Sequence, residues 1–466
     1  MLGLSKRIAE FVTTTNFADI PELARSRGAR AIIDTLGVMT AGSASELAEP
    51  ICRYAEESGA HGNVPILGTG KTTDGEKAAL INAAFGHALD FDDGYPYYPV
   101  HASVVVLGAL ISALSEIPKN NPMSGQNFLE AYILGIEVVT CIGRGMGMGH
   151  YIKRGFHSTG TLSGFATVVA LAKLKAVDAD TLQRTIGIVA SMSSGIQRNF
   201  GTMMKPLHSG MAAQNGVIAT AMAAAGITAH MDIMEGKDNF FQVYGDEGSS
   251  AEKAGDLLGN PFAFVQHGIG MKNFPSSNAC ARPIDGVLQL REKHGLNPDN
   301  VAKIHLILPP GGTNPLRSAK PETTTEAPYS MEFSIAVALV DGAVRLHHFT
   351  KDAIQRTDLL SQLGKVSMEE DPRCIAEDPL AETRGPGPRG FIEVHVTTVD
   401  GQAHHIRVDI APGYPGRELS SDALWAKFSD CTGFAGIDQK ESRDVFDRLE
   451  RLDEVLDIAN VIHKLA

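Results

Sequence analysis

The feature that most constrains the fold is a long succession of helical segments, built largely from small residues, in the first half of the chain. These segments lie at residues 77–90, 102–114, 127–142, 160–174, 180–191 and 211–225. Many of them are dominated by Ala, Gly, Ser and Thr on every face rather than along one apolar stripe. Helices of this kind are buried on several sides, as in the centre of a large bundle. No period of 33 to 45 residues emerges, which excludes a helical solenoid.

After about residue 266 the pattern changes from helices to a mixture of strands and helices. Residues 301–308 alternate and end at two prolines, and residues 391–398 and 404–410 flank an Asp-Gly turn, which predicts a β-hairpin. Residues 331–344 resemble a buried helix, and helical periodicity returns from residue 420. We therefore expect a mainly α protein. A large all-helical domain (1–266 with 412–466) would be interrupted by a smaller inserted α+β domain (267–411).

The composition of this 466-residue chain excludes some classes of partner and favours one cellular compartment. A formal net charge of −13 argues against nucleic acid or an anionic membrane as a partner. The five cysteines are scattered and form no C-x-x-C pair, which favours a reducing cytoplasm. The longest strongly apolar run, residues 102–114, is shorter than the ~20 residues that a membrane helix needs. The first residues lack the apolar region of a signal peptide, so we expect a cytoplasmic protein.

The densest polar cluster in apolar surroundings is His-Ala-Leu-Asp-Phe-Asp-Asp at residues 87–93. His87 and Asp90 share a helix face, and a Tyr- and Pro-rich loop follows and ends at His101. Three interpretations stay open: a metal site, a metal-free acid/base cluster, or a helix end with solvated acids. We expect no metal, because the spacing shows no clear third and fourth ligand.

Two further segments, residues 154–161 and 205–210, share one order of residue types. Each places a cation (Arg154 or Lys205) three residues before a histidine, which is followed by a serine and a glycine at the start of a small-residue helix. Free N–H groups and the helix dipole attract anions there, so two such ends could hold a dicarboxylate. Ser158 and His208 then become candidate ligands. The alternative is that the serines are helix caps and the histidines packing residues.

The motifs together resemble those of the MmgE/PrpD family. The matching stretches are residues 87–93, 155–161, 205–210, 272–275 (Lys-Asn-Phe-Pro), 329–333 and 340–342. The resemblance implies a large helical domain, a smaller α+β domain, a homodimer, and a site between the domains that uses neither metal nor cofactor. It also implies a small dicarboxylate substrate and chemistry that begins by removing a proton from carbon next to a carboxylate.

By motif match, the residues implied to act are Asp90, His101, His157, Lys205 and Lys272. The chain departs from the family in three places. Decarboxylase members carry a histidine in the loop after Lys-x-Phe/Tyr-Pro, whereas residues 276–282 here contain none. Phe333 stands where tyrosine is common, and Gly94 where threonine is common. These departures disfavour decarboxylation and, less strongly, dehydration.

We therefore expect an epimerase of the iminodisuccinate type, which removes and returns an α-proton. The proton-transfer candidates are His101 or His157 with Lys205, and Tyr151 in reserve. The expected carboxylate ligands are Arg154, Lys272 and Arg282. The alternatives are a lyase of the 2-methylcitrate dehydratase type and a non-catalytic dicarboxylate-binding protein with the same fold.

Overall fold

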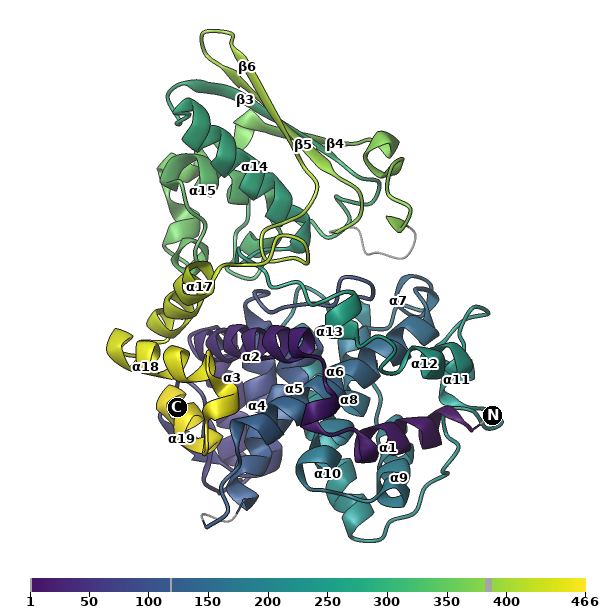
Figure 1. The fold of residues 1–466 in the computed structure, drawn as a ribbon. Helices are drawn as coiled ribbons and strands as arrows, with labels where there is room; N and C mark the ends of the chain where they lie inside the picture. Colours follow the sequence, from purple (N-terminus) through teal and green to yellow (C-terminus); the bar gives the residue numbers. More distant parts are fainter. Residues whose placement is uncertain (1, 118–119, 382–387) are drawn as a thin grey trace. The chain divides into compact units, whose positions relative to one another are not determined.

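The fold is described by a computed structural model, which covers residues 2–117, 120–381 and 388–466. The chain divides into two compact units (Figure 1). Unit 1 consists of Met1–Ala88, Asp92–Ile269 and Leu424–Ala466, and unit 2 consists of Leu89–Phe91 and Gly270–Ala423. Sequence analysis placed the two main boundaries after residues 266 and 411, and it did not anticipate the short excursion at Leu89–Phe91. The expected fold class, mainly α with a smaller α+β part, is confirmed.

Unit 1 is a helical bundle with one short β-hairpin, β1 (Val64–Ile66) and β2 (Lys71–Thr73). Its helices are α1 (Leu4–Thr14), α2 (Glu22–Gly42), α3 (Ala48–Glu57), α4 (Gly75–Ala88), α5 (Ala102–Ala113), α6 (Gly125–Met146), α7 (Gly149–Ile152), α8 (Ser158–Leu174), α9 (Ala179–Ala190), α10 (Met204–Ala224), α11 (Phe240–Tyr244), α12 (Ala251–Leu257) and α13 (Ala263–Gln266). At the carboxyl end, α17 (Ser421–Phe434) begins at the unit boundary, and α18 (Gln439–Leu449) and α19 (Ile458–Ile462) follow.

The centre of unit 1 is formed by α4, α5, α8 and α10, the small-residue helices. Every residue of α5 is buried. Glycine allows the backbones to approach closely: a Cβ atom on Gly210 of α10 would lie 2.3 Å from the carbonyl oxygen of Leu80 in α4. The prediction that small side chains mark a central bundle is therefore confirmed.

Alternate glycines at residues 143–149 favour a flexible loop from the sequence, but in the structure this stretch is largely helical. α6 continues to Met146, and Gly147 ends it with a φ of +76°. Gly143 lies against the ring of Tyr98, where a Cβ atom would come within 2.6 Å of Cδ1. Gly145 lies equally close to the backbone of α12. These glycines thus serve helix packing rather than loop flexibility.

Unit 2 is built on a four-stranded sheet with the order β4-β3-β5-β6. β3 (Val301–Leu308) pairs in parallel with β4 (Val366–Glu370) and antiparallel with β5 (Ile392–Thr398), and β6 (Ala403–Val408) completes the predicted hairpin. β4 was not predicted, because its sequence Val-Ser-Met-Glu-Glu is half-buried or exposed and shows no apolar alternation.

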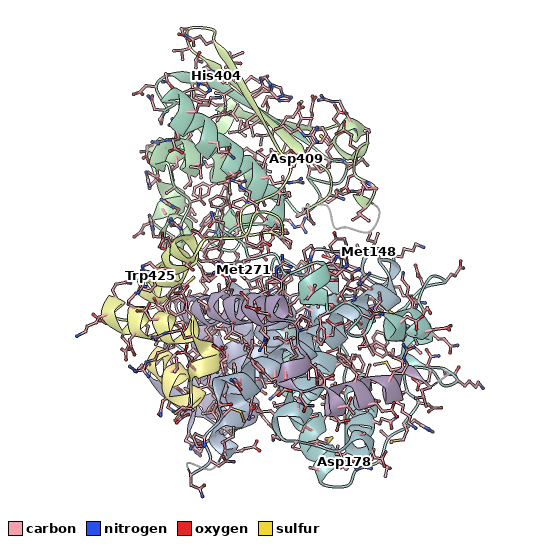
Figure 2. All side chains as sticks on the ribbon, in the orientation of Figure 1. Met148, Asp178, Met271, His404, Asp409 and Trp425 are labelled. Carbon is pink, nitrogen blue, oxygen red and sulfur yellow. The ribbon has the colours of Figure 1, made fainter. Side chains whose placement is uncertain are left out.

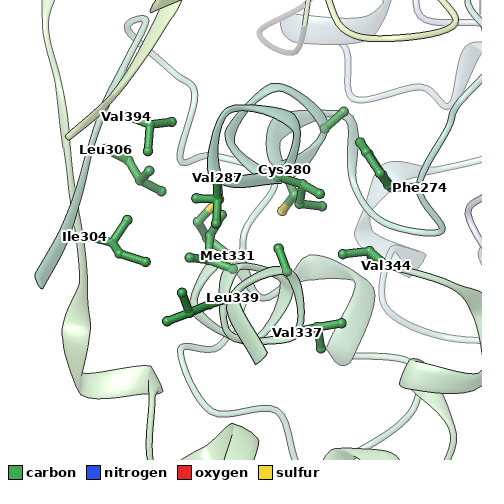
Figure 3. Close-up of a cluster of buried hydrophobic side chains, with 14 of the residues drawn as sticks. Phe274, Cys280, Val287, Ile304, Leu306, Met331, Val337, Leu339, Val344 and Val394 are labelled. Atoms are coloured by element: carbon green, nitrogen blue, oxygen red, sulfur yellow. The ribbon is translucent and has the colours of Figure 1, made fainter. Parts of the chain in front are cut away.

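Two helices, α14 (Asn278–His294) and α15 (Met331–Asp341), contact each other, and α14 also contacts β5 and β6. A buried cluster joins Val287 of α14 and Met331 of α15 to strand residues such as Leu306 and Val394 (Figure 3). Figure 2 labels His404 at the hairpin. Its ring stacks on that of His294 in α14, with centroids 4.0 Å apart. The short helix α16 (Thr357–Leu360) completes the unit. Across the described residues of both units, no helix combines the length and apolar character needed to span a membrane.

Candidate functional site

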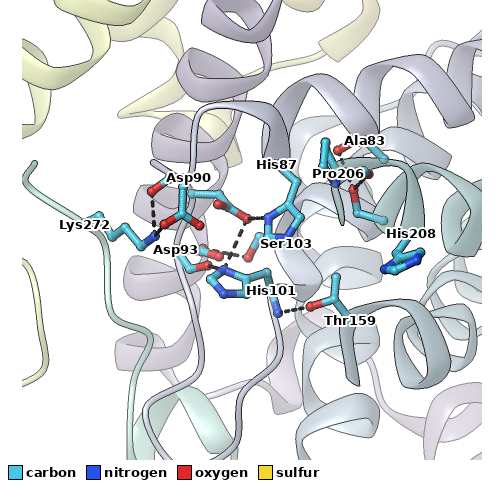
Figure 4. A network of polar contacts seen from close by, with 12 residues as sticks. Ala83, His87, Asp90, Asp93, His101, Ser103, Thr159, Pro206, His208 and Lys272 are labelled. Carbon is cyan, nitrogen blue, oxygen red and sulfur yellow. Dashed lines mark hydrogen bonds and ion pairs between the residues drawn. The ribbon is translucent and has the colours of Figure 1, made fainter. Parts of the chain in front are cut away.

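A buried triad lies just beyond α4 in unit 1, where two histidines share one carboxylate (Figure 4). His87 Nδ1 lies 2.8 Å from Asp92 Oδ2, and His101 Nδ1 lies 3.2 Å from the same oxygen. The side chains of His87 and Asp92 are fully buried, whereas that of His101 is 18% exposed. Only His101 therefore presents part of its ring to the exterior.

Burial and mutual contact set the charges of this triad. Burial lowers the pKa of His87 to about 4, although Asp92 opposes the shift. Burial alone would raise the pKa of Asp92, but the neighbouring His87 and His101 hold it well below its usual range. Near neutral pH the site thus contains an ionised Asp92 beside a neutral His87.

Hydrogen bonds fix which nitrogen of His101 carries the proton. His101 Nδ1 lies 2.6 Å from the carbonyl oxygen of Asp93, which can only accept. Nδ1 must therefore donate, and Nε2 is left with the lone pair that can take a proton. The Asp93 carboxyl is itself fixed, because the Ser103 hydroxyl donates to it at 2.7 Å. Burial, with Asp34 nearby, raises the pKa of Asp93 well above its usual range.

The two similar segments at residues 154–161 and 205–210 meet through their histidines. His157 Nδ1 and His208 Nδ1 lie 3.0 Å apart, so one ring donates to the other. His157 also stacks on His87, with centroids 5.6 Å apart. Burial, followed by the charges of His87 and Lys205, lowers the pKa of His157 well below its usual range. Unit 1 thus places His101, His87, His157 and His208 in one continuous group of rings.

The second segment lies within the first turns of its helix, so the expected start of that helix at Ser209 and Gly210 is wrong, whereas the dicarboxylate role of the two segments stays a prediction. α8 does begin at Ser158, with His157 in the capping position. α10, however, begins at Met204, before Lys205. Ser209 is therefore inside the helix, where its hydroxyl donates to the Pro206 carbonyl at 2.6 Å. The Ser209 hydroxyl therefore does not cap the amino end of α10, and the cationic side chain in the first turn of this helix is Lys205.

Phe200 connects Lys205 to the histidines. The ring of His157 meets that of Phe200 edge-on with centroids 4.8 Å apart, and Lys205 Nζ lies 5.7 Å from the centre of the same ring. The positive charge of Lys205 helps to lower the pKa values of His87 and His157. The predicted residues His101, His157, Lys205 and His208 therefore belong to one neighbourhood of unit 1.

The remaining two motif residues, Asp90 and Lys272, pair within unit 2 (Figure 4). Lys272 Nζ lies 3.1 Å from Asp90 Oδ2 and donates to the Asp90 carbonyl oxygen at 2.5 Å. The Lys272 side chain is 3% exposed. Asp90 adopts a φ of +50°, which is uncommon for a residue with a side chain. An ammonium group has three donors, so two hydrogen bonds leave one for a further acceptor.

The guanidinium of Arg282, expected to grip a carboxylate, is engaged with the backbone of unit 2. It donates to the carbonyl oxygens of Gly390 at 2.6 Å, Arg389 at 3.0 Å and Asp409 at 3.3 Å. Burial lowers its pKa to about 10. The residues around it, expected to form a loop, instead form the first turns of α14. Arg282 therefore ties α14 to two backbone segments, at residues 389–390 and at Asp409, and substrate binding would compete with these bonds.

The other predicted ligands are placed as follows. Arg154 is exposed and donates to the Val243 carbonyl at 3.2 Å. Tyr151 is half-buried at the end of α7, and Ser158 is fully buried at the start of α8. None of the contacts described for these three joins them to the triad, so their roles stay predictions.

Sequence analysis singled out residues 87–93 but did not place His87 or Asp92 among the candidate site residues. The signal was present, because both lie in the motif, but the i, i+3 pairing favoured Asp90 as the partner of His87. The positive φ at Asp90 turns the chain, and Asp92 rather than Asp90 reaches the His87 ring. A local backbone reversal of this kind cannot be read from helical spacing.

Comparisons with known proteins identify the family of this chain. The domain models of the MmgE/PrpD N-terminal and C-terminal domains match residues 6–252 and 274–451. A cis-aconitate decarboxylase of Mus musculus is 26% identical over 412 residues, which cover 86% of this chain and 81% of that protein. One of Homo sapiens is 23% identical over 86% of this chain and 82% of that protein, and one of Aspergillus terreus is 22% identical over 80% and 81%. With both domain models matched across most of its length, the chain belongs to the MmgE/PrpD family and is an enzyme.

Proposed function

We propose that the protein is a lyase that acts on a small polycarboxylate, and that cis-aconitate is the first substrate to test. The relatives described above carry the name of a decarboxylase, whereas the isomerase interpretation finds no support among them. The observation that carries the proposal is the arrangement of His101. Its Nδ1 is held by the Asp93 carbonyl and Asp92, and its Nε2 is left available for proton transfer.

The proposed reaction needs a carbanion next to a carboxylate and a group that protonates it. In decarboxylation, the bond between carbon and one carboxylate breaks, carbon dioxide leaves, and the electron pair stays on the carbon until a proton arrives. Protonated His101 would supply this proton from Nε2, and Asp92 would stabilise the imidazolium. The charge of Lys205, close to His157, would hold a substrate carboxylate.

One of His157 and His208 would bind the substrate as a neutral donor. Burial lowers the pKa of both, so near neutral pH they are uncharged and each ring carries one N–H. The shared Nδ1 contact uses the N–H of the donating ring, so only the accepting ring can offer an N–H, at Nε2, to the substrate. A neutral donor polarises a carboxylate without fixing it as a permanent ion pair, which suits a substrate whose charge changes during the reaction.

A second candidate, dehydration of the 2-methylcitrate type, is favoured by one observation. Residues 276–282 contain no histidine, and in the structure they lead into α14 rather than form a loop with a free acid. In dehydration, His101 Nε2 would remove the proton next to the carboxylate, and the hydroxyl group would leave as water after protonation.

Proton NMR in D2O with cis-aconitate, 2-methylcitrate and iminodisuccinate would test the proposal. Loss of carbon dioxide from cis-aconitate supports decarboxylation, and a new alkene from 2-methylcitrate supports dehydration. Deuterium uptake into iminodisuccinate without loss of any fragment would refute the lyase assignment, as would silence with the first two compounds.

Two variants and one control test the residues. His101→Asn keeps a donor near the position of Nδ1 but lacks Nε2, so we expect turnover to fall by about 10²- to 10⁴-fold. Lys205→Met should raise KM and lower kcat, because it removes the carboxylate-binding charge. His230→Asn is the control, since the His230 side chain is 91% exposed. Wild-type turnover in His101→Asn would contradict the assignment of Nε2.

A further inference from the structure

His87, Asp92 and His101 bring three metal-type ligand atoms together. One nitrogen of each histidine and one carboxylate oxygen lie within 4.8 Å of one another. Among the residues that the structure describes, this is the one group of three such side chains. Sequence analysis expected no metal because the spacing lacked a third ligand. The fold supplies that ligand by bringing His101 back to Asp92 across the intervening loop.

Two of the three separations between the ligand atoms are close to those around a small divalent cation. Zinc bonds to nitrogen and oxygen at about 2.0–2.2 Å, so ligand atoms around a tetrahedral zinc lie ~3.3 Å apart. Asp92 Oδ2 lies 2.8 Å from His87 Nδ1 and 3.2 Å from His101 Nδ1. Shifts of a few tenths of an ångström would bring these two pairs to that distance. The second carboxylate oxygen, Asp92 Oδ1, is buried without a hydrogen-bond partner, so the carboxylate has bonding capacity in reserve.

We infer that unit 1 binds a borderline divalent transition cation, such as Zn²⁺ or Co²⁺, through His87 Nδ1, Asp92 Oδ2 and His101 Nδ1, and that this cation inhibits the enzyme. Two imidazoles and one carboxylate favour such ions over Mg²⁺ and Ca²⁺, which prefer oxygen ligands. Three protein ligands leave a fourth position for water or an anion. Because Lys205 contributes a positive charge nearby, binding should be weaker than at a structural zinc site.

Inhibition is expected because a bound cation changes which ring nitrogen of His101 carries the proton. In the metal-free protein, Nδ1 donates to the Asp93 carbonyl and Nε2 carries the lone pair. A cation on Nδ1 needs the lone pair there, so the proton moves through solvent to Nε2 and the ring stays neutral. Nε2 can then no longer accept a proton, and the bond to Asp93 is lost. The cation thus prevents His101 from forming the imidazolium that donates the proton in the proposed decarboxylation, without touching the substrate; this part of the inference rests on the proposed function.

The binding test uses the full chain and does not depend on the proposed reaction. Co²⁺ is titrated while its visible absorption is recorded, and Zn²⁺ is then added to displace it. We expect one Co²⁺ per chain with the intense bands of a four-coordinate site, displaced by Zn²⁺ but not by Mg²⁺. Weak bands typical of six water ligands, or no saturable signal, would overturn the inference.

His87→Asn and Asp92→Asn locate the ion. Asparagine at position 87 keeps an N–H near the position of Nδ1 for Asp92 but is a poor zinc ligand, so the fold should persist while Co²⁺ binding falls at least tenfold. His305→Asn is the matched control, because His305 pairs with Glu369 at 3.3 Å in unit 2 without a third ligand. Undiminished binding in His87→Asn would refute the assignment.

X-ray absorption on the Zn²⁺-loaded wild-type protein identifies the ligands without any substitution, so it tests the site even if a variant fails to fold. Two imidazole ligands are expected, and a spectrum with none would refute the site. Failure of the proposed lyase reaction would leave these binding results unchanged, so the two proposals fail separately.

Discussion

The buried histidine His87 should make unit 1 sensitive to mild acid, and the size of the effect follows from its pKa. Its ordinary value is about 6.5, and burial lowers it to about 4 in the folded protein. The unfolded chain therefore binds more protons than the folded chain between these values, and stability falls as the pH drops through this window. For His87 alone, the loss between about pH 7.5 and pH 5 is about 2 kcal/mol.

The perturbation that isolates this effect is His87→Asn, which cannot titrate but keeps an N–H beside Asp92. The single tryptophan, Trp425, lies on α17 within unit 1 and packs edge-on against Phe446 at 5.2 Å. Its fluorescence during urea unfolding therefore reports on the unit that contains His87. We expect the wild type to lose about 2 kcal/mol more than His87→Asn between the two pH values.

His157 titrates with the same sign, so the variant should keep part of the acid sensitivity. His230→Asn, which alters an exposed side chain, should match the wild type at both pH values. Equal pH dependence in the wild type and His87→Asn would refute the reasoning, because it would mean that His87 titrates alike in the folded and unfolded chains.

Three other substitutions test separate parts of the structure. Lys427→Met breaks the buried pair with Asp34 at 2.7 Å and should lower the free energy of unfolding of unit 1 by about 3–5 kcal/mol, again followed through Trp425; a loss below 1 kcal/mol would contradict it. Arg282→Lys should lower the calorimetric transition temperature of unit 2 but leave KM unchanged, because the arginine guanidinium binds backbone carbonyls. A raised KM with an unaltered transition temperature would instead support the predicted carboxylate-binding role of Arg282. Gly94→Thr should fold, since a Cβ atom there would lie 3.4 Å from His101 Cε1. The threonine hydroxyl should raise kcat/KM for cis-aconitate, whereas Gly94→Val, which has the same shape without the hydroxyl, should not. Equal effects of the two substitutions would exclude the hydroxyl as the cause.

Periodicity and small-residue content were enough to predict the helical bundle and the hairpin. β3 has the predicted bounds, Val301–Leu308, because alternation and the following prolines mark both its face and its end. β4 could not be found, since a strand that is half-buried at a sheet edge carries no regular apolar pattern. The helix predicted over residues 211–225 begins earlier, at Met204, since the proline at position 206 is tolerated in the first turn of a helix.

The motifs predicted candidate site residues but not the contacts between them. His101, His157 and Lys205 were identified from motifs, yet the Asp92 carboxylate that joins His87 to His101 depends on a backbone reversal at Asp90. The backbone contacts of Arg282 could not be predicted for a related reason. The sequence around an arginine does not show whether its guanidinium donates to backbone carbonyls, as that of Arg282 does, or binds a ligand. Only the fold distinguishes the two cases.

The interleaving of the two units has a consequence for synthesis on the ribosome. Asp34 emerges early, but its counter-ion Lys427 lies in the last segment of unit 1, beyond the whole of residues 270–423. Until that segment leaves the exit tunnel, a nascent unit 1 would have to bury an unpaired carboxylate or leave α2 incompletely packed. Completion of the bundle is thus postponed to the end of translation, and a chain stopped before α17 should be a substrate for chaperones and proteases rather than a smaller folded enzyme.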